Sequence, residues 1–178
     1  IIWCTAFWKG VFYVQNDTNL HCCCFTGHRP EKLKYSEEEI KPLLADAIDR
    51  AIADGYTTFI TGIAPGTDIW AAELVLEKKK QNDELCLICA VPHPGFVRRK
   101  SAREAKRYSS IIRHADRIPT ICSRYSSACY RRRNKFMVDM SGLVIAVWSG
   151  VPSGTKNTIN YAAQKDVRTV NVLDGVCI

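Results

Sequence analysis

The sequence predicts an α/β fold with one doubly wound, mostly parallel sheet and helices on both of its faces. Short apolar runs of strand length alternate with amphipathic helical stretches along most of the chain. Strands separated by helices require right-handed crossovers, which produce a parallel sheet covered on both sides. The length of 178 residues fits one domain. The hydrophobic fraction of 47% and the charged fraction of 24% are those of a folded globular protein.

The first strand is expected at 21–26, with the sequence HCCCFT. The following helix begins at a capping box made by Ser36 and Glu39, in which each side chain accepts a hydrogen bond from the other residue's backbone amide. Its apolar side chains recur three and four residues apart, so one stripe of the helix faces a core. They are Ile40, Leu43, Leu44, Ala47, Ile48, Ala51 and Ile52. Gly55 is expected to end this helix.

The remaining elements repeat the alternation of strand and helix. Strands are expected at 57–61, 85–91, 143–148 and 168–173, with a weaker one near 117–122. Helices are expected at about 67–81, 97–114, 131–141 and 155–164. These elements predict a Rossmann-like domain over residues 21–178.

Residues 1–20 are interpreted as an N-terminal extension, either an extra strand or a loosely attached segment. Their apolar run stops at Lys9, which is too short to span a bilayer, and they lack the features of a signal peptide. We therefore expect no membrane partner.

The nine cysteines lie mostly in apolar strand-like runs, which indicates reduced and mostly buried thiols. Cys86 and Cys89 have the spacing of a metal or redox pair, but in a strand their side chains point to opposite faces. We expect no metal site and identify no cofactor other than the ligand discussed below.

Three strand-to-helix loops, at 26–30, 61–68 and 149–155, are marked by glycine and polar residues. The carboxyl ends of parallel strands meet at one edge of the sheet, where ligands bind in such folds. Gly62 and Gly66 permit positive φ angles and a close approach of backbone or ligand. We therefore expect an anion to be held at this edge.

The third loop leads into a helix at Gly154 and Thr155. Their amides, the Thr155 hydroxyl and the positive end of the helix dipole suit a phosphate, and Gly150 relaxes the turn before them. Asp68, in the second loop, either accepts hydrogen bonds from ribose hydroxyls or caps its own helix.

His28 and Arg29 occupy the first loop, where a cation would meet an anionic ligand and a histidine would donate or titrate. A plain surface turn is the alternative for His28.

Basic residues concentrate between 97 and 135, so strongly that this segment accounts for the whole net charge of +7. Such a surface attracts phosphates and would serve nucleic-acid binding. The alternative is a solvated helix face.

Four stretches together resemble a known family. They are FTGHRPEKL, FITGIAPGTDIWAAE, RRNKFMVDMS and LVIAVWSGVPSGTKNTINYA. In this order and spacing they resemble the YpsA-like branch of the SLOG superfamily, relatives of the DNA-processing protein DprA and of the LOG phosphoribohydrolases. The resemblance covers about residues 22–173. It implies a Rossmann-like fold, a pocket for a nucleotide or nucleotide-derived ligand, and a cytoplasmic protein of bacterial or phage origin.

The resemblance also implies which positions lie near the ligand. They are Gly27, His28, Arg29, Gly62, Gly66, Asp68, Glu73, Arg133, Asn134, Asp139, Gly150, Gly154 and Thr155. LOG enzymes share an Arg, Met and Ser pattern, matched by Arg133, Met137 and Ser141, but carry a glutamate where this chain has Thr158. Cleavage of a glycosidic bond needs such a carboxylate, so its loss counts against LOG-type hydrolysis.

Three hypotheses for the function follow. The first is a sensor or regulatory module that binds a nucleotide-derived ligand at the glycine-rich loops. The second is a hydrolase acting on a glycosidic or phosphate bond of that ligand, with Glu73 or Asp139 as the acid–base group. The third is DprA-like binding of single-stranded DNA through residues 97–135. The sequence leaves the oligomeric state open, a homo-oligomer included.

Overall fold

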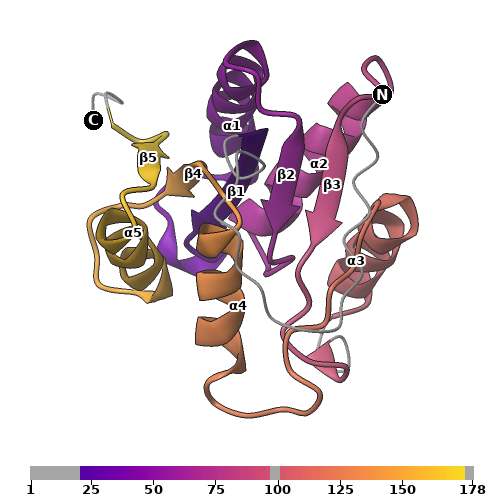
Figure 1. Ribbon diagram of the computed structural model, residues 1–178, viewed down its shortest axis with the longest axis vertical. Helices are drawn as coiled ribbons and strands as arrows, with labels where there is room; N and C mark the ends of the chain where they lie inside the picture. Colours follow the sequence, from indigo (N-terminus) through magenta and orange to yellow (C-terminus); the bar gives the residue numbers. More distant parts are fainter. Residues whose placement is uncertain (1–20, 97–100, 175–178) are drawn as a thin grey trace.

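The computed structural model describes residues 21–96 and 101–174. Its centre is a parallel sheet of five strands in the order β3-β2-β1-β4-β5 (Figure 1). The strands are β1 (Cys22–Gly27), β2 (Thr58–Thr61), β3 (Cys86–Cys89), β4 (Leu143–Val147) and β5 (Arg168–Asn171). The expected doubly wound, Rossmann-like architecture is confirmed.

The helices of the described residues connect these strands. They are α1 (Glu37–Ala53), α2 (Thr67–Lys79), α3 (Ala102–His114), α4 (Cys129–Asp139) and α5 (Gly154–Gln164), with the short 3-10 helix η2 (Pro30–Lys32) before α1. The expected capping box forms at the start of α1, where Ser36 and Glu39 bond each other's backbone amides. A second box, which the sequence analysis missed, joins Ser101 and Glu104 at the start of α3.

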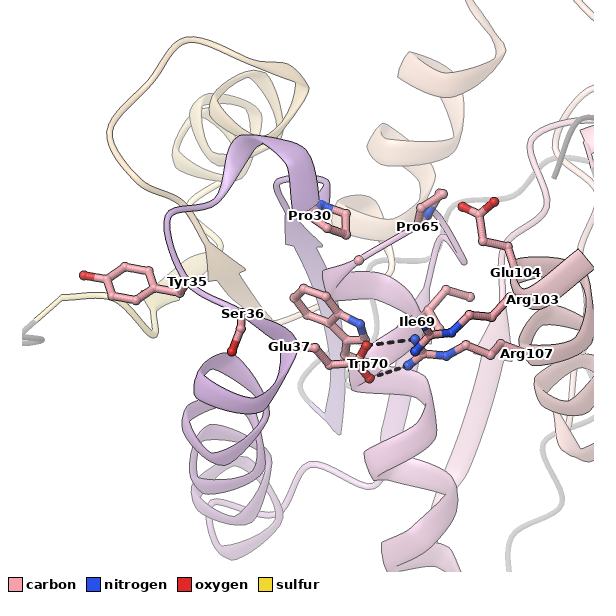
Figure 2. Close-up of a pocket in the computed structure, with 11 residues that line it drawn as sticks. Pro30, Tyr35, Ser36, Glu37, Pro65, Ile69, Trp70, Arg103, Glu104 and Arg107 are labelled. Atoms are coloured by element: carbon pink, nitrogen blue, oxygen red, sulfur yellow. Dashed lines mark hydrogen bonds and ion pairs between the residues drawn. The ribbon is translucent and has the colours of Figure 1, made fainter. Parts of the chain in front are cut away.

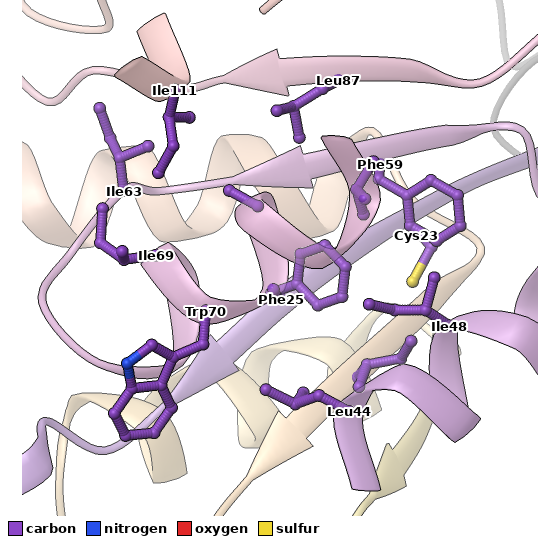
Figure 3. Close-up of a cluster of buried hydrophobic side chains, with 14 of the residues drawn as sticks. Cys23, Phe25, Leu44, Ile48, Phe59, Ile63, Ile69, Trp70, Leu87 and Ile111 are labelled. Carbon is purple, nitrogen blue, oxygen red and sulfur yellow. The ribbon is translucent and has the colours of Figure 1, made fainter. Parts of the chain in front are cut away.

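Apolar side chains alternate between the two faces of the sheet, as parallel strands covered on both sides require. On one face, Phe25 and Phe59 pack with α1, α2 and α3 in the larger core cluster (Figure 3). Their rings stack with centroids 5.9 Å apart. On the other face, Cys24, Ile60 and Val144 pack with α4 and α5 in a smaller cluster. Helices therefore cover both faces, as expected.

The cysteine interpretation holds for the strands. Cys89 belongs to the larger cluster, whereas Cys86 packs against the smaller one on the opposite face. Burial raises the pKa of both Cys24 and Cys89 to about 12, so these thiols stay protonated. Within the described residues, no helix is long and apolar enough to cross a membrane.

Some expected boundaries were wrong. Residues 117–122 do not form a strand: they follow β3 through isolated bridges at Arg117 and Thr120, and Pro119 between them has no amide hydrogen to donate to a ladder. Helix α4 begins at Cys129, two residues earlier than expected. The expected helix at 97–114 begins only at Ala102, because Ser101 before it is extended and caps the helix. Residues 97–100 of that expectation lie outside the described residues, as does the N-terminal extension at 1–20.

The order of the strands reverses at β1, and this reversal positions the loops. From β1 the chain proceeds through β2 to β3 on one side, then crosses to β4 and β5 on the other. In open α/β sheets, ligands bind beyond the carboxyl ends of the strands next to such a reversal. Here that point lies between β1 and β4.

We expect Phe59→Ala to lower the free energy of unfolding by about 3–5 kcal/mol, because the fully buried ring leaves a cavity beside Phe25. Urea denaturation monitored by circular dichroism would measure this loss. Ile118→Ala is the control, since that side chain is 43% exposed and its removal should cost less than about 0.5 kcal/mol. Equal losses in the two variants would contradict the assigned core.

Candidate functional site

The loops that follow β1, β2 and β4 leave the sheet at the same edge. The amide of His28, directly after β1, donates to the carbonyl of Val147 at the end of β4, with 3.1 Å between nitrogen and oxygen. This bond holds the first loop to the end of β4, at the reversal of strand order. The predicted convergence of the loops at one edge is therefore seen in the structure.

Glycine allows helix α2 to begin very close to β1. Gly66, the N-cap of α2, has a φ of +88°, which side chains rarely tolerate. A Cβ atom on Gly27 would lie 2.1 Å from Thr67 Oγ1, so no side chain fits between β1 and α2. Gly27 and Gly66 therefore have a packing role that brings the start of α2 to the edge of the sheet.

Gly62 leaves room for the guanidinium of Arg133, which enters from α4. A Cβ atom on Gly62 would lie 1.4 Å from Arg133 Nη1. That nitrogen is 3.4 Å from Asp68 Oδ2, a long ion pair between two side chains that are both less than a tenth exposed. The Ala64 amide donates to the same Asp68 oxygen at 3.3 Å. The structure thus pairs two predicted site residues, Asp68 and Arg133, directly, and a third, Gly62, leaves room for them.

Two buried nitrogen atoms at this edge have no hydrogen-bond partner among the described residues. They are Nε2 of His28 and Nε of Arg133, on side chains that are 2% and 5% exposed as residues. Burial lowers the pKa of His28, and nearby Lys32 adds to this. Burial also lowers the pKa of Arg133, against the opposing effects of Asp68 and Tyr130. A buried polar atom without a partner is costly, so both nitrogens are suited to meet a ligand.

Helix α5 presents its amino end at the same edge. Ser153, which the sequence analysis did not single out although serine is a preferred N-cap, accepts a hydrogen bond from the Lys156 amide at 3.3 Å. A Cβ atom on Gly154 would meet none of the described residues within 4 Å. Thr155 is buried and Gly154 is exposed. The first turn of α5 therefore has open space in front of it.

Asn134 and Gly150 complete the surroundings of α5. Asn134 Nδ2 donates to Thr158 Oγ1 at 2.9 Å, and that hydroxyl donates to the Gly154 carbonyl at 3.0 Å. This hydroxyl belongs to the residue that the sequence resemblance aligns with the glutamate of LOG enzymes. Gly150 has a φ of +88° in the loop before α5. Arg29, in the first loop, is exposed.

The two candidate acid–base residues lie elsewhere. Asp139 is the last residue of α4, just before β4 begins, so it lies toward the amino ends of the strands. Its carboxylate accepts from the Tyr161 hydroxyl at 2.8 Å. Glu73 accepts two hydrogen bonds of 2.6 Å from Arg107 of α3 and one of 3.0 Å from Lys41 of α1. The structure brings neither carboxylate to the glycine loops.

Glu73 belongs to an ionic network beside a pocket of about 350 Å³ (Figure 2). In this pocket Glu37 of α1 and Arg107 of α3 face each other next to Trp70, and two hydrogen bonds of 2.9 and 2.7 Å join them. Burial alone would raise the pKa of Glu37, but hydrogen bonds from Arg107 and Lys41 lower it to about 2. The same balance lowers the pKa of Glu73. Because these charges are paired with one another, the network stabilises the packing of three helices. The unpaired nitrogens of His28 and Arg133 are therefore the better candidates for ligand contacts.

Only part of the basic segment, residues 97–135, is exposed. Its exposed cations among the described residues are Arg103, Lys106, Arg113, Arg117, Arg124, Arg131, Arg132 and Lys135. Arg107 is paired with Glu37 and Glu73, and Arg133 is buried against Asp68. The exposed basic surface is therefore smaller than the sequence alone suggests, because Arg107 and Arg133 are not part of it.

These features define a Rossmann-like domain with glycine-rich loops at its topological switch point. Comparison with known proteins identifies the family: the chain belongs to the YpsA family, described as the YspA SLOG family, whose model matches residues 23–172. The chain is 33% identical over 137 residues to the uncharacterized SPbeta prophage-derived protein YoqJ of Bacillus subtilis, which covers 70% of this chain and 80% of that protein. It is 27% identical over 150 residues to a UPF0398 protein of Bacillus thuringiensis, and this match covers 79% of this chain and 80% of that protein.

Two solved structures of DNA processing protein A share the fold. The Helicobacter pylori protein matches with a TM-score of 0.59 and 19% identity, over 86% of this chain and 65% of that one. The Streptococcus pneumoniae protein matches with a TM-score of 0.60 and 14% identity, over 84% of this chain and 49% of that one. The match therefore spans less than two thirds of either protein. These comparisons support the resemblance found in the sequence.

We expect Arg107→Gln to lower the free energy of unfolding at pH 7 by about 1–3 kcal/mol, because two half-buried carboxylates lose hydrogen bonds from a cation. The folded pKa of Glu37, about 2, lies below its ordinary value of 4.5. The stability from the network is therefore fully present above about pH 4.5 and is lost as the pH falls toward 2. Urea denaturation between pH 7 and 2.5 should show the two proteins converging.

The control is Arg50→Gln, which removes a pair with Asp46 whose side chains are 77% and 60% exposed. That variant should lose less than about 0.5 kcal/mol. A difference between wild type and Arg107→Gln that stays constant with pH would contradict the assigned role of the carboxylates.

Proposed function

We propose that this protein binds a nucleotide-derived ligand at the carboxyl edge of β1 and β4 and acts as a sensor or regulatory module in the bacterial cytoplasm. The observation that carries the proposal is the pair of buried nitrogens, His28 Nε2 and Arg133 Nε, that have no partner among the described residues. His28 lies at the reversal of strand order, where ligands of α/β sheets bind, and Arg133 lies against the neighbouring loop after β2. A ligand with anionic and hydrogen-bonding groups would satisfy them.

The phosphate would lie at the amino end of α5. The amides of Gly154 and Thr155 offer donors at the positive end of the helix dipole, and Gly154 adds no side chain to the open space there. Arg133 would pair with the phosphate from α4, and exposed Arg29 would approach it from the first loop. Asp68 would bond ribose hydroxyls. Family membership supports this arrangement, because the site lies within the residues that the family model matches.

The positions of the carboxylates favour binding over hydrolysis. Thr158 stands where a LOG enzyme has its glutamate, and its hydroxyl is already bonded to Asn134 and the Gly154 carbonyl. Glu73 is held ionised by Arg107 and Lys41, so it would be a poor proton donor. Asp139 lies toward the other edge of the sheet.

Binding of single-stranded DNA is the second candidate function. The Helicobacter pylori neighbour has a described mode of single-stranded DNA binding. In this chain the exposed cations of α4 and the preceding loop, Arg124, Arg131 and Arg132, would supply phosphate contacts. Such binding would weaken steeply with salt, whatever happens at Gly154.

Gly154→Asp should weaken nucleotide binding on the order of 100-fold, because a carboxylate placed where phosphate binds repels it. The fold should persist, since aspartate is favourable in the first turn of a helix. Calorimetry and thermal-shift assays with nucleoside monophosphates, NAD, ADP-ribose and cyclic dinucleotides would measure both properties, and chromatography of each mixture would reveal any turnover.

The matched control is Asn160→Asp, which adds the same charge at an exposed position further along α5. It should bind as wild type does. Unchanged affinity in a folded Gly154→Asp variant would remove the site from the amino end of α5.

A further inference from the structure

An aromatic cluster lies where the β3 loop meets the start of α4. The ring of His93, 7% exposed as a residue, is edge-on to its neighbours. Its centroid is 5.1 Å from that of Tyr125, 6.2 Å from that of Tyr130 and 6.1 Å from that of Phe96. A buried histidine thus contacts Phe96 of its own loop and two tyrosines from a segment about 30 residues further along the chain.

The two tyrosines of this cluster are open to solvent. Tyr125 is 65% exposed and Tyr130 is 39% exposed, although each ring also packs edge-on against His93. Ring packing of this kind fixes an aromatic side chain while leaving surface free, which is the arrangement of a stacking platform. If the tyrosines served only to bury His93, they would not need to lie beside a ligand site.

Their position is next to the site of the proposed function. Tyr130 precedes Arg133 by three residues and Asn134 by four on α4, so the three side chains share one stripe, roughly one turn of about 5 Å apart. Between Arg117 and Lys135 the chain has no acidic residue. A ligand whose phosphate lies at Arg133 and α5 would therefore extend toward the tyrosines without meeting a negative charge from this segment.

Resting on the proposed function, we propose that Tyr125 and Tyr130, supported by His93, form a stacking subsite for the base of the nucleotide held at the glycine loops. The offset of about one helical turn suits the separation of base and phosphate in a nucleoside monophosphate. Tyr125 and Tyr130 both pack against the single ring of His93, and a platform of this size accommodates one base, whereas a single strand of DNA would call for a longer row of rings. The occupant is therefore a mononucleotide unit.

The experiment compares ligands with and without a base. The probes are AMP, GMP, CMP and UMP on one hand and ribose 5-phosphate on the other, titrated by calorimetry into wild type, Tyr125→Ala, Tyr130→Ala and the double variant. Loss of stacking should weaken the preferred nucleotide by about tenfold in a single variant and leave ribose 5-phosphate unchanged. Tyr130→Phe should bind as wild type does, because a phenyl ring also stacks.

Met140→Ala is the control, since it removes an exposed apolar side chain just beyond the other end of α4. Equal weakening of nucleotide and ribose 5-phosphate by the tyrosine variants would overturn the subsite, because that result indicates a structural role. A wild-type protein that binds ribose 5-phosphate as tightly as every nucleotide would overturn it while leaving the proposed function standing.

Two further outcomes also decide the matter. If none of the probes binds wild type, the proposed function and the subsite fall together. The other outcome is that oligothymidylate binds, with an affinity that the tyrosine variants weaken and Gly154→Asp leaves unchanged. In that case the tyrosines belong to a nucleic-acid surface, and the mononucleotide subsite is overturned.

Discussion

The site depends on one buried charge, the guanidinium of Arg133. A buried cation needs a close counter-ion and full hydrogen bonding to offset its desolvation. Asp68 supplies the counter-ion, but at 3.4 Å, and Arg133 Nε has no partner among the described residues. Gly62 makes this placement possible because any Cβ atom would overlap the guanidinium. The fold thus brings α4 against the loop after β2 and keeps a charge there that the protein does not fully satisfy.

Helix α2 separates this site from the ionic network. Asp68 and Glu73 are five residues apart, so they project from different sides of the helix. Asp68 faces Arg133 of α4, whereas Glu73 faces Lys41 of α1 and Arg107 of α3. Two carboxylates from one motif therefore have different roles. Asp68 is the counter-ion of the buried Arg133 at the edge of the sheet, and Glu73 links α2 to α1 and α3.

Periodicity and local signals were enough to predict the strands, the parallel sheet, the capping box at Ser36 and the loops at the switch point. They were enough because each depends on residues close in sequence and on a topology with few alternatives. The strand expected at 117–122 was wrong because hydrophobic alternation alone takes no account of Pro119, which has no amide hydrogen to donate to a strand ladder. Glu73 was nominated by motif alone, and its pairing with Arg107 depends on a contact 34 residues away that no local pattern contains. The cluster around His93 is equally non-local, since Tyr125 and Tyr130 reach it from a segment more than 30 residues away.

Under the proposed function, the weakness of the Arg133–Asp68 pair gives ligand binding a mechanism for a response. A phosphate at α5 would compete with Asp68 for Arg133, because charge-assisted hydrogen bonds to phosphate are stronger than a 3.4 Å contact. Release of Asp68 from Arg133 would free an acceptor for ribose hydroxyls. Because the same Asp68 oxygen accepts from the Ala64 amide, a shift of this carboxylate toward the ligand would also move the loop before α2. The ligand would then change a loop conformation as well as occupy a space. A binding protein that reports its ligand needs such differential contacts between its free and bound states.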